Sequence, residues 1–281
     1  MPIEFDYLVV GHVARDLMDD SYAIGGTVSY SSRTAVALGC RVGVITSASL
    51  DLDLDGVFEG IRVVRVPSQA TTTFENIYLP EERRQIVHSV ADVLTPDALP
   101  DDWQASIVHI GPIARECSVT LSQAFPDAFL GVTPQGWMRR WDETGHIGYG
   151  EWQHAESWLA RADAVVLSDE DVRGDYDLIA RYAAQTRLLV VTHGVVGCTV
   201  YQDGRARHFE AESVHQVDPT GAGDIFAASF FVALQGGSDP WDAARFANCV
   251  AACSVTRPGL SGVPMPDEIA RCRQGLLCGE G

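Results

Sequence analysis

The chain contains no lysine, and all 20 of its basic residues are arginines. A P-loop needs a lysine to reach the phosphates of a nucleotide, and Schiff-base enzymes need a lysine amine. Both classes are therefore excluded. Long apolar runs are also missing, because none approaches the ~18–20 residues of a membrane span. The N-terminal stretch MPIEFDYLVVGHV has no signal-peptide features. We expect a cytoplasmic protein with no membrane partner.

Metal-binding and disulfide patterns are absent as well. The seven cysteines form no CxxC pair, and the eight histidines form no HExxH motif. Cys249 and Cys253 lie four residues apart, on one face of an Ala-rich helix. We expect free, mostly buried thiols in a reducing compartment. For His193, in VVTHGVVG, a structural or incidental role is favoured over catalysis.

Positive charge is scarce throughout the sequence. The 38 acidic residues give the chain a formal net charge of −18, and no basic patch is visible. Such a chain repels a polyphosphate backbone at long range, so we expect no nucleic-acid partner. A small anionic ligand would have to be held locally, by backbone dipoles rather than by net charge.

What the chain does contain is an alternation of short apolar runs and helix-like segments. The runs are at 7–11, 41–47, 106–111, 128–133, 163–168 and 188–194, and the helix-like segments include 28–39 and 175–186. This pattern predicts an α/β fold with a parallel sheet covered on both faces. Active sites in such sheets lie at the carboxyl ends of the strands.

Two stretches break this alternation. Residues 12–27 are polar and end in Gly25-Gly26, and residues 60–95 contain IRVVRVP, TTTFENIYL and RQIVHSV. Runs of this kind are typical of antiparallel strands joined by turns. We therefore expect a small β lid, built from about 12–27 and 60–95, on a single domain that spans 1–281.

The segment VDPTGAGDIFAAS carries the strongest chemical signal. Gly221, Ala222 and Gly223 lie between a predicted strand and a predicted helix. Free N–H groups and the positive helix end would hold a phosphate-like anion there. Asp224, in the first helical turn, is either a helix-start acid or a general base that deprotonates an acceptor hydroxyl in phosphoryl transfer.

Three motifs in order resemble the ribokinase-like (PfkB) carbohydrate kinase family. They are GGTVSYSSRTAVALG at 25–39, DPTGAGDIF at 218–226 and ARFANCVAACSVTRPGLSGVP at 244–264. The resemblance covers most of the chain. It implies a three-layer ribokinase-like sandwich with a mainly parallel central sheet, and an ATP-dependent kinase that uses Mg²⁺.

The resemblance also implies roles for individual residues. Asp224 would be the catalytic base, beside an anion hole formed by Gly221, Ala222 and Gly223. The nucleotide would contact Ser168, Thr192, Gly194, Gly197 and Asn248. The substrate pocket would contain Asp16, Gly25, Gly26, Tyr30 and Arg139. A monovalent cation such as K⁺ would bind at Asp218, Thr220, Val255 and Gly259. The alternatives are a helix-face polar residue for Asn248, a solvated acid for Asp16 and an exposed side chain for Arg139.

The chain departs from the family pattern at three places. Tyr30 stands where the family usually has asparagine, so the sugar specificity of ribokinases is not carried over. The family's Asn-x-x-Glu is replaced by SDED, in which Asp171 would hold Mg²⁺ through water. The segment TPQGWMRRWDETG, at 133–145, resembles a Gln-Gly-x-x-Arg pattern of the myo-inositol kinase-like branch, and its arginine is Arg139.

We therefore predict an ATP-dependent kinase of a small polyol, with a cyclitol such as myo-inositol favoured over a sugar. One alternative is a nucleoside kinase, with Tyr30, Phe74 and Trp137 as candidates to stack on the base. A non-catalytic sugar-sensing protein on the kinase fold is another. The altered SDED motif favours it, and the intact Gly-x-Gly-Asp opposes it. We expect a monomer or a homodimer.

Overall fold

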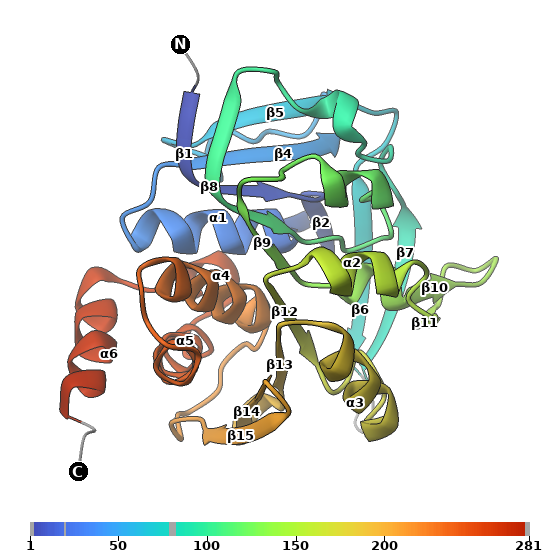
Figure 1. Ribbon diagram of the computed structural model, residues 1–281. Helices are drawn as coiled ribbons and strands as arrows, with labels where there is room; N and C mark the ends of the chain where they lie inside the picture. Colours follow the sequence, from blue (N-terminus) through green and yellow to red (C-terminus); the bar gives the residue numbers. More distant parts are fainter. Residues whose placement is uncertain (1–2, 20, 79–82, 279–281) are drawn as a thin grey trace.

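The computed structural model describes residues 3–19, 21–78 and 83–278. Within them, the main sheet has nine strands in the order β15-β14-β13-β12-β9-β8-β1-β4-β5 (Figure 1). Their bounds are β1 Ile3–Val10, β4 Val42–Ala48, β5 Arg62–Pro67, β8 Trp103–Ile110, β9 Phe129–Val132, β12 Ala164–Ser168, β13 Leu188–Thr192, β14 Gly197–Gln202 and β15 Arg205–Glu210. The strands from β5 to β13 pair in parallel, and β14 and β15 add an antiparallel edge. All six strands predicted from apolar runs are confirmed.

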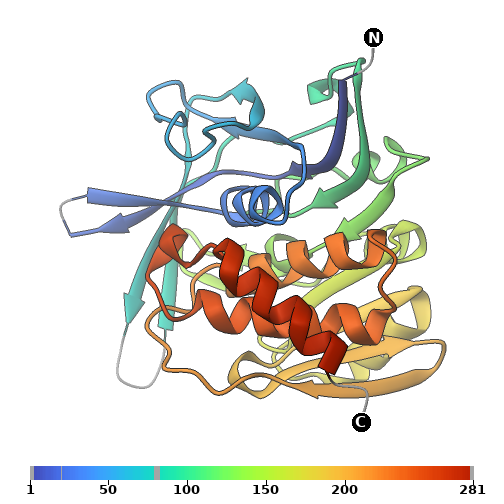
Figure 2. The ribbon, with the colours of Figure 1, turned by 90° about the vertical axis from the view of Figure 1, so that its left-hand side faces the viewer.

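Helices cover both faces of this sheet. One face carries α1 (Thr27–Ala37), α4 (Ala222–Gln235) and α5 (Pro240–Ser254), with α6 (Pro266–Cys278) outside them (Figure 2). The other face carries α2 (Ala155–Arg161) and α3 (Tyr176–Gln185). Short 3₁₀ turns are η1 Pro96–Ala98, η2 Val119–Gln123, η3 Gln135–Met138, η4 Gly194–Val196 and η5 Gly259–Gly262. The predicted three-layer sandwich is confirmed.

The alternation of side chains along the strands explains the two cores. In β1, Tyr7 and Val9 pack with the phenylalanines of α4, whereas Leu8 and Val10 pack with Trp158 of α2 on the opposite face. Successive side chains of a strand point to opposite faces. Because both faces are covered, each central strand needs apolar residues at every position, which is why the sequence shows continuous runs.

A second sheet stands at the edge of the main body. Its order is β3-β2-β6-β7, with β2 Ala14–Met18, β3 Ser21–Gly25, β6 Thr72–Tyr78 and β7 Arg83–Ser89. The expected lid boundaries were wrong in one respect. Strand β5 pairs in parallel with β4 and belongs to the main sheet. A small β10–β11 hairpin, Arg139–Trp141 and Ile147–Tyr149, forms a two-stranded sheet of its own, and its loop is bridged to β7 through His146 and Ile86.

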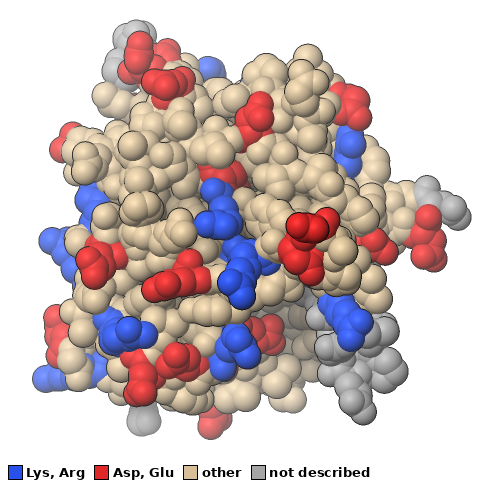
Figure 3. Space-filling view, turned by 90° about the vertical axis from the view of Figure 1, so that its right-hand side faces the viewer, with Lys and Arg blue, Asp and Glu red and all other residues tan. Residues whose placement is uncertain are grey.

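The lengths of the helices and the charges on the surface can be compared with the expectation of no membrane or nucleic-acid partner. No helix in the described part of the chain is long and apolar enough to cross a membrane. On the face shown in Figure 3, arginine and acidic side chains are interspersed rather than gathered into one basic field. This face therefore carries no large basic patch, in keeping with the formal net charge of −18.

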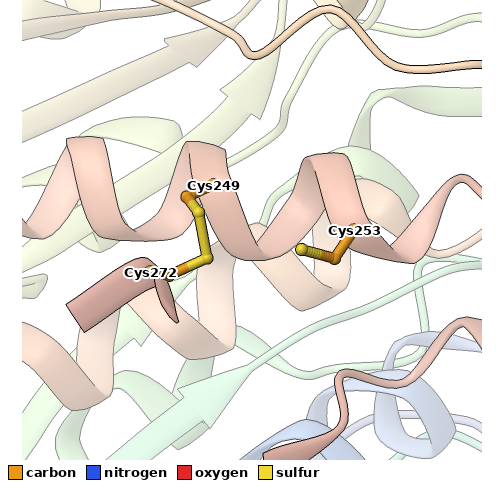
Figure 4. Close-up of side chains that lie close together, drawn as sticks. All are labelled: Cys249, Cys253 and Cys272. Atoms are coloured by element: carbon orange, nitrogen blue, oxygen red, sulfur yellow. A yellow bond between two sulfur atoms is a disulfide. The ribbon is translucent and has the colours of Figure 1, made fainter. Parts of the chain in front are cut away.

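The expectation of free thiols was wrong for two cysteines. Cys249 of α5 and Cys272 of α6 form a disulfide, and Cys253 lies one turn along α5 (Figure 4). Cys40, Cys117, Cys198 and Cys253 are free. The two bonded residues are 23 positions apart. Sequence spacing gave no sign of the pair, because the packing of α6 against α5 brings them together.

Candidate active site

The glycine loop enters α4 through a turn that glycine adopts most easily. Gly221, the N-cap of α4, has a left-handed backbone with φ of 79°. A Cβ atom at this position would lie 2.3 Å from the ring of Tyr30. Any other residue would therefore strain the backbone and collide with α1. The loop packs directly on the N-terminal half of α1.

The N–H groups of this loop divide into two kinds. The N–H of Ala222 donates to the Pro219 carbonyl at 3.1 Å, and that of Ile225 donates to the Gly221 carbonyl at 2.9 Å. Among the described residues, no backbone acceptor is found for the N–H groups of Gly223 and Asp224. The same holds for the N–H of Gly221, so of the three residues predicted for the anion hole only Ala222 has its N–H engaged, by a tight turn.

Asp224 is partly buried and faces α1. Thr27 donates a side-chain hydrogen bond to its carboxylate, and the Ser31 hydroxyl donates to its backbone oxygen at 3.2 Å. Burial raises the pKa of Asp224 to about 6, an effect that Thr27 and the charge of Arg139 oppose and Asp171 reinforces. A carboxyl group in this range suits proton transfer near neutral pH.

Arg139 and Asp171 belong to the same electrostatic neighbourhood. Arg139, at the start of β10, donates from Nη1 to the Ile113 carbonyl at 2.8 Å, and its guanidinium lies 5.4 Å from the ring centre of Phe74. Burial raises the pKa of Asp171, while an N–H from Ser168 at 2.9 Å and the charge of Arg139 lower it. Three predicted residues from distant segments thus influence one another electrostatically, Asp224, Arg139 and Asp171.

The predicted substrate residues of the lid are connected to Asp224 through the segment that enters α1. Asp16 of β2 faces Gly25 of β3 so closely that a Cβ atom on Gly25 would lie 2.1 Å from its carboxylate. Gly26 has φ of 89°, and a Cβ atom there would meet the His12 carbonyl at 2.4 Å. These two glycines lead directly to Thr27, the partner of Asp224. The lid and the loop are therefore joined through one short segment.

The predicted cation residues form a hydrogen-bonded group that joins the glycine loop to the segment after α5. We call this group, Asp218, Thr220, Val255 and Gly259, the latch. Asp218 accepts the Thr220 N–H at 2.9 Å and the Gly259 N–H at 2.8 Å. The Val255 carbonyl accepts the N–H groups of Val217 and Asp218, at 2.7 and 3.1 Å. The structure brings all four predicted residues together, as expected. However, N–H donors point at the oxygens that a cation would need, so the arrangement fits K⁺ poorly.

Two of the predicted nucleotide residues end neighbouring strands, and the other three lie in η4, at the start of β14 and in α5. Ser168 and Thr192 are register partners in β12 and β13. Gly194 begins η4, and a Cβ atom on Gly197 would lie 2.0 Å from the β15 backbone. Asn248 is 7% exposed, and its amide donates to the Phe209 carbonyl at 3.0 Å. Gly197 and Asn248 thus each have a structural task at β15.

The aromatic residues proposed for a nucleoside base are buried. Tyr30, Phe74 and Trp137 are 3%, 3% and 8% exposed. Trp137 packs between Trp152 and Trp158, and its indole N–H donates to the Cys117 carbonyl at 3.0 Å. Because core contacts occupy these rings, the nucleoside alternative loses its sequence support. Tyr30 lies beneath the glycine loop rather than on an open pocket wall.

Sequence reasoning missed the polar groups that support Asp224. Tyr7 bonds to Nδ1 of His109 at 2.7 Å, and Nε2 of His109 bonds to the Thr133 hydroxyl at 2.9 Å. Burial lowers the pKa of His109 to about 3, so this ring is neutral. Tyr7 also shares a hydrogen bond with Ser31, which reaches the Asp224 backbone. The available signal was a tyrosine and a histidine inside otherwise apolar runs.

Comparison with known proteins places this geometry in a family. A model of the pfkB family of carbohydrate kinases matches residues 153–268, which include the glycine loop, Asp224 and α5. The chain belongs to the PfkB family. It is similar to an inositol 3-kinase of Zea mays, with 30% identity over 197 residues, and to a fructokinase of Klebsiella pneumoniae, with 28% identity over 209 residues.

The extent of these PfkB matches differs. They cover 69% and 66% of this chain, and 51% and 67% of the maize and Klebsiella proteins. The chain therefore spans about half the length of the maize relative. Among solved structures, the sulfate complex of a pyrophosphate-dependent kinase in the ribokinase family is similar, with 25% identity and a TM-score of 0.79. That match covers 95% of this chain and 99% of the other, which confirms the ribokinase-like fold.

Proposed function

We propose that the protein transfers a phosphoryl group to a hydroxyl of a small polyol, with a cyclitol such as myo-inositol favoured. One observation carries the proposal. Asp224 has a pKa raised to about 6 and lies at the same helix end as the N–H groups of Gly223 and of its own backbone, for which the described residues provide no backbone acceptor. A proton acceptor and an anion site therefore occupy one place, as phosphoryl transfer requires.

Each group has a distinct task in this mechanism. The carboxylate of Asp224 takes the proton of the acceptor hydroxyl as its oxygen attacks the donor phosphorus. The N–H groups at the start of α4 and the helix dipole stabilise the charge on the transferred group. Thr27 orients the carboxylate through its hydrogen bond. Asp16, which lies against Gly25, would bind acceptor hydroxyls from the lid.

The acidic residues here fit Mg²⁺. Asp171 raises the pKa of Asp224, so these two carboxyl groups repel each other when both are charged. A divalent cation at Asp171, held directly or through water, would relieve that repulsion, and carboxylate and water oxygens are the ligands that Mg²⁺ prefers. When bound, the ion would neutralise charge on the donor phosphates.

ATP is the donor that we propose first, and pyrophosphate is a second candidate. Two observations make pyrophosphate a candidate beside ATP. A structure with 25% identity over nearly the whole chain is that of a pyrophosphate-dependent kinase. In addition, Asn248, predicted to lie beside adenine, donates its amide to β15. Both donors present linked phosphates, so the start of α4 would hold either one.

Two observations support a cyclitol as the acceptor. The maize relative is an inositol 3-kinase, and Arg139 of the Gln-Gly-x-x-Arg pattern acts electrostatically on Asp224. The buried state of Trp137 argues against stacking on a nucleoside base. A carboxyl group with a raised pKa beside an anion site favours a catalytic role over a sensing role.

The test is a panel of donors and acceptors assayed by ³¹P NMR. Each of ATP and pyrophosphate, with Mg²⁺, is paired with myo-inositol, ribose, fructose and cytidine. We expect a myo-inositol phosphate as the main product. Turnover of cytidine with none of myo-inositol would refute the acceptor. No product with any pair would favour a sensing role. The donor that supports turnover decides between the two candidates.

A further inference from the structure

Three cysteine sulfurs lie together between α5 and α6, away from the residues assigned to phosphoryl transfer. Cys249 and Cys253 come from successive turns of α5, and Cys272 comes from the facing side of α6 (Figure 4). All three Sγ atoms lie within 4.8 Å of one another. Cys253 and Cys272 are buried, at 4% and 3% exposure. The cluster is therefore a preassembled group of three soft ligand atoms.

A disulfide alone does not account for this arrangement. The Cys249–Cys272 bond uses two sulfurs and leaves the Cys253 thiol beside them. The guanidinium of Arg271 lies 3.0 Å from that third sulfur. Arg271 thus places a positive charge beside the Cys253 sulfur, an environment that stabilises a thiolate.

The distances are compatible with a metal ion after modest movement. Thiolates bind zinc at about 2.3 Å, which places sulfurs around one ion ~3.8 Å apart. Separations of up to 4.8 Å would shrink by at most about 1 Å, and the bonded pair would have to open. In a reducing compartment this bond would be reduced, which frees all three thiols. Soft thiolate sets select Zn²⁺ and Cu⁺ among biological cations.

We propose that the reduced protein binds one thiophilic d¹⁰ cation, Zn²⁺ or Cu⁺, through Cys249, Cys253 and Cys272. Opening the site takes two equivalents of a thiol reductant. They transfer two electrons and two protons to Cys249 and Cys272, and become a disulfide. The cation then displaces the thiol protons. The ion would link α5 to α6 in place of the disulfide.

The position of the cluster gives the ion a structural consequence. Cys253 and Cys272 pack in the same apolar cluster as Tyr30 and Ile225, which lie under the glycine loop. Arg257, just past α5, also forms two hydrogen bonds with Glu268 of α6, at 2.7 and 2.9 Å. A metal ion that links α5 to α6 would therefore stabilise the apolar residues that pack under the glycine loop. The proposal stands whether or not the protein is a kinase.

The experiment compares the reduced and the oxidised full-length chain by native mass spectrometry and competition titration. Zn²⁺ and Cu⁺ are tested in separate arms. The matched variants are Cys253→Ser and Cys117→Ser, because each removes one buried free thiol and only the first belongs to the cluster. We expect one ion per reduced chain and none per oxidised chain. Cys253→Ser should weaken binding by at least about tenfold, and Cys117→Ser should leave it unchanged.

A second readout covers the case in which Cys253→Ser does not fold. In the reduced wild-type chain, the cation should protect the three cluster cysteines from alkylation, and Cys40 should stay as reactive as without metal. Absence of a stoichiometric ion in both arms would overturn the proposal. Equal affinity of the two variants, or protection spread evenly over all cysteines, would overturn it as well.

Discussion

Asp218 and Asp224 flank the same glycine loop, yet their carboxylates meet different surroundings. Both oxygens of Asp218 accept backbone N–H groups, at 2.9 and 2.8 Å. Asp224 instead meets a hydroxyl, the charge of Arg139 and the repulsive charge of Asp171. The first acid ties the loop to η5, and the second has a pKa raised to about 6. The comparison shows that partners, rather than residue type, decide which acid is suited to proton transfer.

The largest expected effect is that of Asp224→Asn. Asparagine keeps the size and much of the helix-start hydrogen bonding, but it cannot accept the proton of the acceptor. A positioned base contributes ~10²–10⁴-fold, so kcat should fall by at least about 10²-fold with donor affinity nearly intact. Steady-state kinetics and calorimetric donor binding measure both. A variant that keeps more than about a tenth of the wild-type rate would reduce Asp224 to a helix-start acid.

Asp218→Asn should act on stability more than on rate. The new amide would direct a donor at the Gly259 N–H, which loses a hydrogen bond to a charged acceptor. We expect the free energy of unfolding to fall by about 1–3 kcal/mol. The loss in kcat should stay below roughly tenfold, since the latch does not touch the reacting atoms. If Asp218→Asn lowered kcat as much as Asp224→Asn, the two acids would not have different roles, and this account would be contradicted.

The raised pKa of Asp224 also predicts a stability gain on its removal. In the unfolded chain Asp224 ionises near pH 3.8, and in the folded chain near pH 6. Its contribution to stability is therefore present at low pH and is lost as the pH rises through about 6. At about pH 8, Asp224→Asn should raise the unfolding free energy by about 1–3 kcal/mol. Thermal unfolding at low and high pH measures this, and a variant less stable at both would contradict it.

The smallest expected effect concerns the monovalent cation. The sequence motif predicts faster turnover in K⁺ than in Na⁺. The latch oxygens already accept N–H groups, so we expect less than roughly a twofold difference at matched ionic strength. Initial rates in the two salts test this. A strong K⁺ dependence would mean that Asp218 releases its N–H partners when substrates bind.

Local patterns predicted the fold well, because the central strands are buried on both faces. β-branched runs such as 188–194 therefore stood out, and all six runs proved to be strands. The run at 62–67 was assigned to the lid for a physical reason. An edge strand of the main sheet has the same half-polar pattern as a lid strand, and the pattern does not show whether it pairs with β4 or with the lid strands.

The parts of the site that lie within one short segment of the chain could be predicted from the sequence. The GAGD motif located Asp224 and the α4 N-terminus. It could not show that Thr27 bonds to Asp224 or that Tyr30 packs under Gly221, because α1 is nearly two hundred positions away. The disulfide between Cys249 and Cys272 escaped notice for the same reason. Long-range packing creates these contacts, and a single sequence carries no local trace of them.

The measurement that tests the account most directly is a ¹³C NMR titration of the Asp224 carboxyl group in the free protein. Its resonance is assigned by its loss in Asp224→Asn, with Asp218→Asn as the matched control. The account predicts a titration with a pKa of about 6, unchanged in the Asp218 variant. A carboxyl group that titrates near the ordinary value of 3.8 would contradict the claim that this site is arranged for proton transfer.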